Sequence, residues 1–404
     1  MFAFAVALFI PHLAHAQTKS ANAKKLPRAR QLDQHVLFER EASSGELRVA
    51  TSGADTHAQG SEEVSDRAIQ VVTQMVAVTC SVFTTEGDPV PGLTRGDFRI
   101  YDNGVAQQIA YFDASTQPAS VALIIDASPS VLRDTDEMKR AASALVDALA
   151  PLDQAAVADF SAHTYLQLPF SDVRELIRRA VARVDPRQLL GDTGGSNIYE
   201  AVYLVARDLF PGRTGRKSIV LLTDGQDSGL GLTLDPTTAS PRPGLAENRL
   251  TFDDVTRLLA SEDIQLFAVS TEPRPGIMTA DWLASHAVTT LLTSASRREN
   301  IPPDTLYLAE LVRRAGGQLY FLHDKETLAD TFRDIASKIR AEYTLGFYPA
   351  AGSASASPSA AADGITATPS ATAATASGWH QLRVDLPDQA DARPSYRSSY
   401  FVSP

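Results

Sequence analysis

The sequence predicts an α/β protein with a mainly parallel central sheet, flanked by a small β module. Across residues 117–343, apolar runs that suit fully buried strands alternate with stretches of helical periodicity, which is the pattern of βαβ units. The flanking segments, 69–114 and 343–404, instead carry short alternating strands and turn residues. Neither flanking segment holds enough strands for a sheet core, so we expect the two chain ends to build one β module together.

The chain begins with an apolar run at residues 2–13, followed by Ala14-His15-Ala16. This small-x-small triplet predicts a signal peptide over residues 1–16, cleaved before Gln17. The run is too short to span a bilayer comfortably, and it lacks the usual basic residues before it, which leaves the true translation start open. Residues 17–68 are polar with mixed charge, and we expect a mostly disordered leader. A secreted, periplasmic or cell-envelope protein without a transmembrane span in its mature chain follows from this interpretation.

Composition argues against several classes of function. The 404 residues carry a net charge of −11, which disfavours nucleic acid and anionic membrane surfaces as partners, because both attract basic patches. The single cysteine, Cys80, cannot form an intramolecular disulfide and is expected to be a buried apolar residue. The sequence has no nucleophile elbow, no zinc-protease helix motif and no phosphate-binding loop. Its eight histidines show no pair at metal-ligand spacing, so we expect neither zinc nor an enzyme, and we interpret His163 as structural.

The β module begins with residues 69–84, whose apolar content suits one or two strands. Residues 97–112 predict two alternating strands joined by Asp102-Asn103-Gly104, a strong hairpin signal because asparagine and glycine tolerate left-handed turn conformations. The C-terminal part is expected to contribute strands at 343–348, 379–386 and 396–402, with a flexible Ala/Ser/Thr/Pro-rich insert at 349–377.

The central segment predicts strands and helices in alternation. After the strand that ends at Asp126 we expect helices at 134–149, 172–184, 197–209, 252–261, 305–315 and 327–343, and further strands at 155–160, 165–168, 218–223, 265–270 and 318–322. Residues 273–303 exceed a normal connection between a strand and a helix, and we interpret them as an insertion.

Oxygen-bearing side chains follow two of the buried strands. The run VALIIDASPS reaches Asp126 and then presents Ser128 and Ser130, and the run SIVLLTDGQDS ends in Thr223-Asp224-Gly225. Between them, the glycine-rich stretch GDTGGSNIYEAV places Ser196 just before a helical pattern. Ligands in open α/β sheets sit beyond the carboxyl ends of strands, so the three loops can converge at one edge. Two carboxylates and three hydroxyls suit a hard dication such as Mg²⁺.

The three motifs resemble the metal-ion-dependent adhesion site of von Willebrand factor A domains, which reads Asp-x-Ser-x-Ser, then Gly-Gly-Thr, then Thr-Asp-Gly. The resemblance covers residues 117–343 and implies a Rossmann-like domain. It also implies that Ser128 and Ser130 bind Mg²⁺, or Mn²⁺ or Ca²⁺, directly, and that Asp126 and Asp224 bind it directly or through water.

The sequence differs from the family pattern at Ser196, which stands where the family usually has threonine. Serine keeps the hydroxyl and lacks the methyl group that restricts the rotamer, and Thr193 is the alternative ligand in this loop. A von Willebrand factor A domain whose site binds no metal remains the other interpretation. Asp227 and Glu200 lie beside the motif residues and either accept hydrogen bonds from them or are simply solvated.

The β module is similar to one that precedes the A domain in a bacterial group of secreted proteins, the "VWFA-related" proteins common in acidobacteria. The matching positions are Gly92-Leu93-Thr94, Asp97-Phe98, Tyr101-Asp102-Asn103-Gly104 and Gln108-Ile109. The family resemblance implies metal-dependent binding of a protein or envelope ligand through an acidic group of that partner. Two alternatives are a structural envelope protein whose metal only joins loops, and a metal-assisted hydrolase that uses Asp126 and Asp224, although the motif loops contain no candidate base.

Overall fold

The structure is a computed structural model. It describes residues 26–32, 38–40, 47–49, 75–85, 88–114, 117–186, 195–227, 250–272, 303–322, 328–340, 342–349 and 378–402. The expected signal peptide, Thr193, most of the leader and nearly all of the expected segments 273–303 and 349–377 lie outside the described residues.

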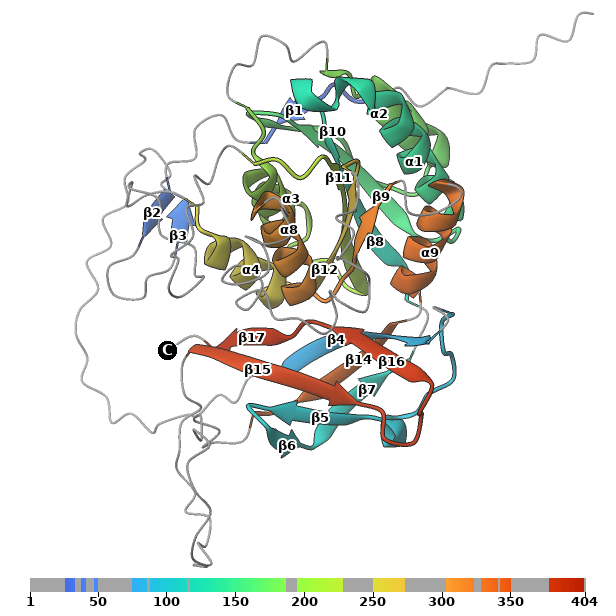
Figure 1. The fold of residues 1–404 in the computed structure, drawn as a ribbon, viewed down its shortest axis with the longest axis vertical. Coiled ribbons are helices and arrows are strands. Elements are labelled where there is room, and N and C mark those ends of the chain that lie inside the picture. Colours follow the sequence, from blue (N-terminus) through green and yellow to red (C-terminus); the bar gives the residue numbers. More distant parts are fainter. Residues whose placement is uncertain are drawn as a thin grey trace, which may run out of the picture.

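A seven-stranded sheet forms the centre of the larger part of the molecule, in the order β1-β10-β9-β8-β11-β12-β13 (Figure 1). Five strands run parallel: β8 (Ala119–Asp126), β9 (Gln154–Phe160), β11 (Arg216–Thr223), β12 (Ile264–Ser270) and β13 (Leu319–Phe321). Beyond β9, the strand β10 (Thr164–Ser171) runs antiparallel to β9, and the edge strand β1 (Arg30–Gln31) runs antiparallel to β10. The mainly parallel sheet expected from the sequence is confirmed, with an antiparallel edge.

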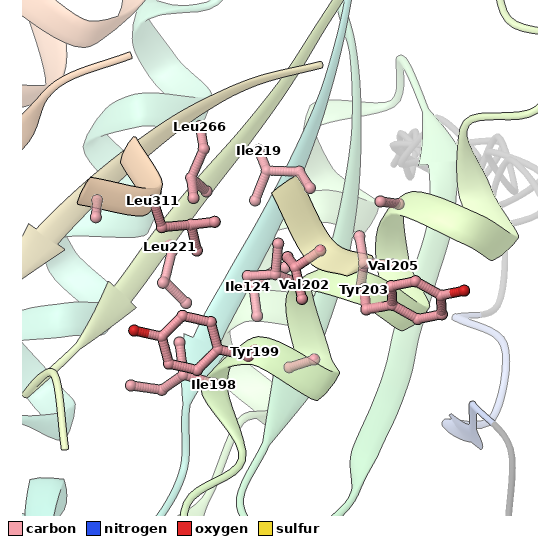
Figure 2. Close-up of a cluster of buried hydrophobic side chains, with 14 of the residues drawn as sticks. Ile124, Ile198, Tyr199, Val202, Tyr203, Val205, Ile219, Leu221, Leu266 and Leu311 are labelled. Atoms are coloured by element: carbon pink, nitrogen blue, oxygen red, sulfur yellow. The ribbon is translucent and has the colours of Figure 1, made fainter. Parts of the chain in front are cut away.

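Helices cover both faces of this sheet. One face packs against α1 (Thr135–Ala148), α2 (Arg174–Arg183) and α9 (Leu328–Arg340), and the other against α3 (Ile198–Leu209), α4 (Phe252–Ser261) and α8 (Pro303–Arg314) (Figure 1). Figure 2 shows Ile124, Leu221 and Leu266 of the sheet in one buried cluster with Val202 of α3 and Leu311 of α8. Their sequence neighbours, such as Leu123 and Val220, are buried on the opposite face. Burial on both faces explains why these strands are unbroken apolar runs.

The strand order reverses at β8. From β8 the chain passes through α1 to β9 on one side, and the later strand β11 is added on the other side. In open α/β sheets the carboxyl ends of two such neighbouring strands diverge toward different connections and leave a crevice between them. Asp126 and Thr223 are the last residues of these two strands, so the predicted motif residues lie at this reversal point.

The β module is a two-layer sandwich. Its sheets have the orders β16-β4-β14-β7 and β17-β15-β5-β6. Its strands are β4 (Val76–Thr84), β5 (Arg99–Asp102), β6 (Val105–Gln107), β7 (Ile109–Asp113), β14 (Glu342–Phe347), β15 (Gly378–Asp385), β16 (Ala392–Tyr396) and β17 (Ser399–Val402). Because β4 pairs with β14 and β16, and β5 pairs with β15, both chain ends form the same sheets. The expected β module from both chain ends is confirmed.

Apolar residues from both sheets meet in the interior of the sandwich. Val78 and Cys80 of β4, Leu345 of β14 and Val384 of β15 lie in one buried cluster. Cys80 is a free, buried thiol, as expected from its place in an apolar run. Burial raises the pKa of this thiol far above its usual range, which favours its neutral form.

Three element boundaries differ from expectation. The Asn103-Gly104 turn is left-handed, with φ of 48° and 83°, and it joins β5 to β6 as predicted. The chain then leaves this sheet, and β7 joins the other layer, so residues 97–112 form three strands instead of two. Helix α9 ends at Arg340 and does not reach Tyr343, because β14 pairs with both β4 and β7. The expected strand at 396–402 is divided between β16 and β17.

Residues 26–32 differ from the expected disordered leader. Arg30 and Gln31 pair with β10 at the edge of the central sheet, and Leu32 is 2% exposed within the apolar core. A second short pair, β2 (Phe38–Arg40) and β3 (Leu47–Val49), also lies within the leader. These described residues are therefore ordered parts of a leader that was expected to be mostly disordered. Among the helices that the structure describes, none is both long and apolar enough to span a bilayer.

The sandwich packs against the amino edge of the central sheet. Asp263 lies just before β12, and its carboxylate accepts a 2.5 Å hydrogen bond from Thr79 of β4 and forms a 3.2 Å ion pair with Arg397. Ser81 of β4 donates to the backbone carbonyl of Lys338 at 3.4 Å. Because the sandwich covers the amino edge, the motif residues at the carboxyl edge lie at the opposite end of the larger part of the molecule (Figure 1).

Candidate metal centre

Asp126 is the residue at which the three loops meet. Its side chain is fully buried, and its Oδ1 atom accepts a 2.9 Å hydrogen bond from the backbone N–H of Ser128. Its Oδ2 atom accepts hydrogen bonds from the hydroxyl groups of Thr223, at 2.7 Å, and Ser196, at 3.4 Å. One carboxylate thus contacts the loop that follows β8, the end of β11 and the residue before α3.

The first loop turns immediately after β8. Ala127 N donates a 2.7 Å hydrogen bond to the carbonyl oxygen of Phe160, which fastens the loop to the end of β9. A short 3-10 helix, η2 (Pro129–Arg133), follows. The hydroxyl oxygens of Ser128 and Ser130 lie 2.9 Å apart on the two sides of Pro129. Ser128 is buried and Ser130 is exposed, so this hydroxyl pair extends from the buried carboxylate toward solvent.

The third loop leaves β11 in a tight turn. Gly225 has a φ of 86°, a left-handed conformation that strains residues with a Cβ atom. The backbone N–H of Gly225 donates to Thr223 Oγ1 at 3.0 Å, and that of Gln226 donates to Asp224 Oδ1 at 2.9 Å. Asp224 is 6% exposed, and these contacts keep its carboxylate at the carboxyl edge of the sheet.

The second loop is described from Gly195 onward. Gly195 has a φ of 88°, and Ser196, which follows it, is buried. Asn197, the N-cap residue of α3, contacts the turn between β9 and β10. Its backbone N–H donates to the carbonyl oxygen of Ser161 at 2.9 Å, and its side-chain amide donates to the carbonyl oxygen of Ala162 at 2.8 Å. These contacts of Asn197 hold the adjacent residue, Ser196, next to the turn that follows β9.

Negative charge accumulates at this edge. Burial raises the pKa of Asp126 to about 6, and the charge of Asp224 adds to the effect, against the hydrogen bonds from Ser128 and Thr223. Asp304, in the first turn of α8, also has a raised pKa because it is partly buried and faces the charges of Asp227 and Asp224. The charged neighbour that shifts Asp126 most is another carboxylate, so a cation placed here would relieve repulsion.

The donor set fits a hard dication. Asp126 and Asp224 offer carboxylate oxygens, and Ser128, Ser130 and Ser196 offer hydroxyl oxygens, which are the ligand types that Mg²⁺, Mn²⁺ and Ca²⁺ take in proteins. Within the described part of the chain there is no group of three or more His, Cys, Asp or Glu residues that could hold a metal, so any site here depends on the hydroxyls.

Two residues that contribute to the site were not predicted as site residues. Thr223 belongs to the Thr-Asp-Gly motif, and its contact with Asp126 becomes visible only once β8 and β11 are neighbours. Asp304 lies in the first turn of the distant helix α8, where an acidic residue normally indicates only a favourable interaction with the helix dipole. Glu200, which was considered beside the site, lies in the first turn of α3, and its Oε2 atom is 3.5 Å from the amide nitrogen of Asn197.

Comparison with known proteins identifies the central part of the chain. Residues 121–226 match the family model of the von Willebrand factor type A domain, and this range contains all three motifs. The resemblance stated from the motifs is therefore confirmed over residues 121–226, which match a von Willebrand factor type A domain. No curated protein matches the chain.

Several solved structures are similar at low identity. An aerotolerance-related membrane protein from Bacteroides fragilis is 18% identical, with 55% of this chain and 98% of that chain covered and a TM-score of 0.37. A von Willebrand factor type A protein from Catenulispora acidiphila is 16% identical, with coverage of 67% and 52% and a TM-score of 0.36. Proximal thread matrix protein 1 from the mussel byssus, with a zinc-occupied MIDAS motif, is 16% identical, with coverage of 58% and 48% and a TM-score of 0.37.

Proposed function

We propose that this protein binds a ligand through a divalent metal, outside the cytoplasm. The metal, Mg²⁺ or else Mn²⁺ or Ca²⁺, would be held by a set of five residues at the carboxyl edge of the sheet: Asp126, Ser128, Ser130, Ser196 and Asp224. The observation that carries the proposal is the environment of Asp126, a fully buried carboxylate that faces a second carboxylate and accepts hydrogen bonds from two hydroxyl groups. The match of residues 121–226 to the von Willebrand factor type A domain supports it.

The chemistry of the donors indicates the class of ligand. A bound dication would supply a positive charge and an open coordination position at this edge. Three of the five donors are neutral hydroxyls, so Asp126 and Asp224 neutralise the charge only partly and leave an electrostatic preference for an anionic group. Ser130 is exposed, so a partner can reach this side of the site. We therefore propose that the partner, a protein or another envelope component, contributes a carboxylate.

Our proposal is binding without catalysis. The structure describes two histidines, and neither belongs to the proposed donor set: His163 is exposed in the turn between β9 and β10, and His380 is buried in the sandwich. The hydroxyl of Ser128 is paired with that of Ser130. This arrangement suits a metal ligand better than a nucleophile, which needs an adjacent base.

A binding assay with acidic peptides tests the proposal. The full chain is titrated into a fluorescent glutamate-rich peptide in Mg²⁺ or Mn²⁺, and again in EDTA, with the glutamine-rich peptide of the same length as the matched control. We expect binding of the glutamate peptide that EDTA and Asp224→Asn both abolish, and no binding of the glutamine peptide. Metal-independent binding of both peptides would contradict the proposal. Metal binding without any affinity for the acidic peptide would leave the metal a structural role only.

The natural partner can be sought with the same contrast. Crosslinking of the full chain to its native envelope, with and without EDTA, should yield a product that is present only when the metal is. The wild-type and Asp224→Asn chains are compared so that metal-independent crosslinks are discounted. Localisation is tested separately by mass spectrometry of the mature chain, in which the proposal of export expects Gln17 at the N-terminus.

A further inference from the structure

The amino end of α3 is capped by a residue from a different loop. The backbone N–H of Ile198, the first residue of the helix, donates a 2.7 Å hydrogen bond to Oδ2 of Asp227. Asn197 occupies the N-cap position, but its own side chain makes no capping bond and donates instead to the carbonyl oxygen of Ala162. First-turn N–H groups have no partner within their helix, and a carboxylate near them is also favoured by the helix dipole.

This cap links two of the three motif loops. Asp227 lies three positions after Asp224, beyond the left-handed turn at Gly225, and Ile198 lies two positions after Ser196. The hydrogen bond between Asp227 and Ile198 therefore ties the loop that carries Asp224 to the loop that carries Ser196. At 3.4 Å, the hydrogen bond from Ser196 to Asp126 is the longest of the three that Asp126 accepts, and the first residue of α3 lies only two positions after Ser196.

We propose that Asp227 is a positioning residue for the metal centre. By capping α3 from the loop that carries Asp224, Asp227 keeps the hydroxyl of Ser196 and the carboxylate of Asp224 close to the carboxylate of Asp126. This inference rests on the proposed function, because it assigns Asp227 a role in a site that Ser196 and Asp224 form together. It goes beyond the motif residues, since Asp227 acts through the backbone of Ile198.

Two substitutions at this position separate positioning from charge. Asp227→Ala removes the acceptor for the Ile198 N–H, whereas Asp227→Asn keeps an acceptor oxygen and removes the charge. Residues that orient metal ligands typically change metal affinity by about 10- to 100-fold when lost. For the full chain titrated with Mn²⁺ in a calorimeter, we expect about a 10-fold loss of affinity in Asp227→Ala and an affinity close to wild type in Asp227→Asn.

The matched control is a helix cap at the same edge of the sheet. Thr251 caps α4: its hydroxyl accepts from the backbone N–H of Asp254 at 3.3 Å, and the carboxylate of Asp254 accepts from Thr251 N at 2.8 Å. Thr251→Ala should lower the melting temperature as a lost cap does, by an amount comparable to Asp227→Ala, without changing Mn²⁺ affinity. Equal losses of affinity in the two variants would show a merely structural effect and overturn the inference.

A metal-free measurement completes the test. Amide hydrogen exchange of the metal-free full chain should show faster exchange at the first turn of α3 in Asp227→Ala than in wild type or Asp227→Asn. If wild type binds Mn²⁺ and Asp227→Ala binds it equally well, the inference is wrong and the proposed function stands. If wild type itself binds no Mn²⁺, the proposed function fails and this inference fails with it.

Discussion

Thr223 Oγ1 donates a 2.7 Å hydrogen bond to Asp126 Oδ2 and so joins the carboxyl ends of β11 and β8 at the point where the strand order reverses. The same hydroxyl accepts a 3.0 Å hydrogen bond from the backbone N–H of Gly225. Thr223 is fully buried, so both contacts are shielded from water. The residue therefore orients the carboxylate of Asp126 and shapes the turn that presents Asp224.

The first prediction concerns Thr223. Thr223→Val preserves the shape of the side chain but removes both hydrogen bonds, and each such bond typically contributes about 1 kcal/mol. We expect a free energy of unfolding lower by about 1–3 kcal/mol and weaker Mn²⁺ binding, measured by thermal melting and calorimetry. Thr223→Ser keeps the hydroxyl and serves as the control. Unchanged metal affinity in Thr223→Val would show that the orientation of Asp126 does not depend on this bond.

Metal affinity should depend on pH through Asp126. Its pKa is raised from 3.8 to about 6, first by burial and then by Asp224, so the folded metal-free protein favours the neutral carboxyl. The raised pKa of Asp126 therefore contributes to the stability of the folded metal-free protein. This contribution is fully present below pH 3.8 and is lost as the pH rises through about 6. A metal needs the carboxylate, so binding releases the proton below this pKa.

Calorimetric titrations with Mn²⁺ between pH 5 and 8 check this dependence. The apparent affinity should fall by about tenfold per pH unit below about pH 6 and level off above it. Asp159 is a control, because burial raises its pKa to about 6 as well while it accepts hydrogen bonds from Gln167. Asp159→Asn should leave the profile unchanged. A flat wild-type profile from pH 5 to 7 would contradict the assignment of Asp126.

The serine before α3 provides a third prediction. Ser196→Ala should weaken metal binding, because it removes a hydroxyl that also donates to Asp126. Ser196→Thr should keep or strengthen it, since the branched side chain is stiffer about χ1 and loses less freedom on coordination. Calorimetry on both variants measures the effect. If Thr193→Ala is the damaging change while Ser196→Ala is silent, the ligand in this loop has been misassigned.

The environment of Glu342, at the junction between the two parts of the molecule, predicts that the stability of the folded protein depends on pH. It is 6% exposed, and neither carboxylate oxygen has a hydrogen-bond partner among the described residues. Burial raises the pKa of Glu342 well above its usual range. The positive charge of Arg216, whose Nε atom lies 3.9 Å from Oε2 of Glu342, opposes this rise, whereas the negative charges of Asp263 and Asp153 add to it. The neutral side chain of Glu342 therefore stabilises the folded state fully below its ordinary pKa of 4.5. This contribution to stability is lost as the pH rises toward the pKa that Glu342 has in the folded state.

Replacement of Glu342 by glutamine should remove this loss. Glu342→Gln is expected to melt above wild type at pH 8, with the difference shrinking toward pH 5, because glutamine cannot ionise. Asp388→Asn changes an exposed carboxylate and should show no such trend. A Glu342→Gln chain that melts below wild type at both pH values would indicate that the interaction with Arg216 outweighs the desolvation of the carboxylate.

Much of the candidate metal centre could be predicted from the sequence because each of its three motifs is a short local pattern. Asp126 and Asp224 each end an unbroken apolar run, and two neighbouring parallel strands bring such ends to the same edge. Ser128 follows by its spacing from Asp126, and Ser196 by its place between a glycine and a helix. These relations need only the alternation of strands and helices, which the sequence expresses clearly.

The remaining features depend on contacts between distant segments. Asp304 comes near Asp224 because α8 begins at the same edge as β11 ends, and no local pattern indicates this. Arg30 and Gln31 form a strand only because β10 offers an open edge, since two residues carry no periodicity. The predicted end of α9 was wrong because the pairing of β14 with strands on both sides outweighs a helical pattern that continues in the sequence.

The central claim is that Asp126 and its neighbours hold a divalent metal. The most direct measurement is calorimetric titration of the purified full chain with Mg²⁺ and Mn²⁺, repeated for Asp126→Ala and for Asp159→Ala. Asp159 is the matched control, because it is a similarly buried carboxylate on the adjacent strand β9 and is not among the proposed ligands. We predict one bound metal ion per chain for wild type and Asp159→Ala, and none for Asp126→Ala. Equal metal affinity in wild type and Asp126→Ala would contradict this prediction.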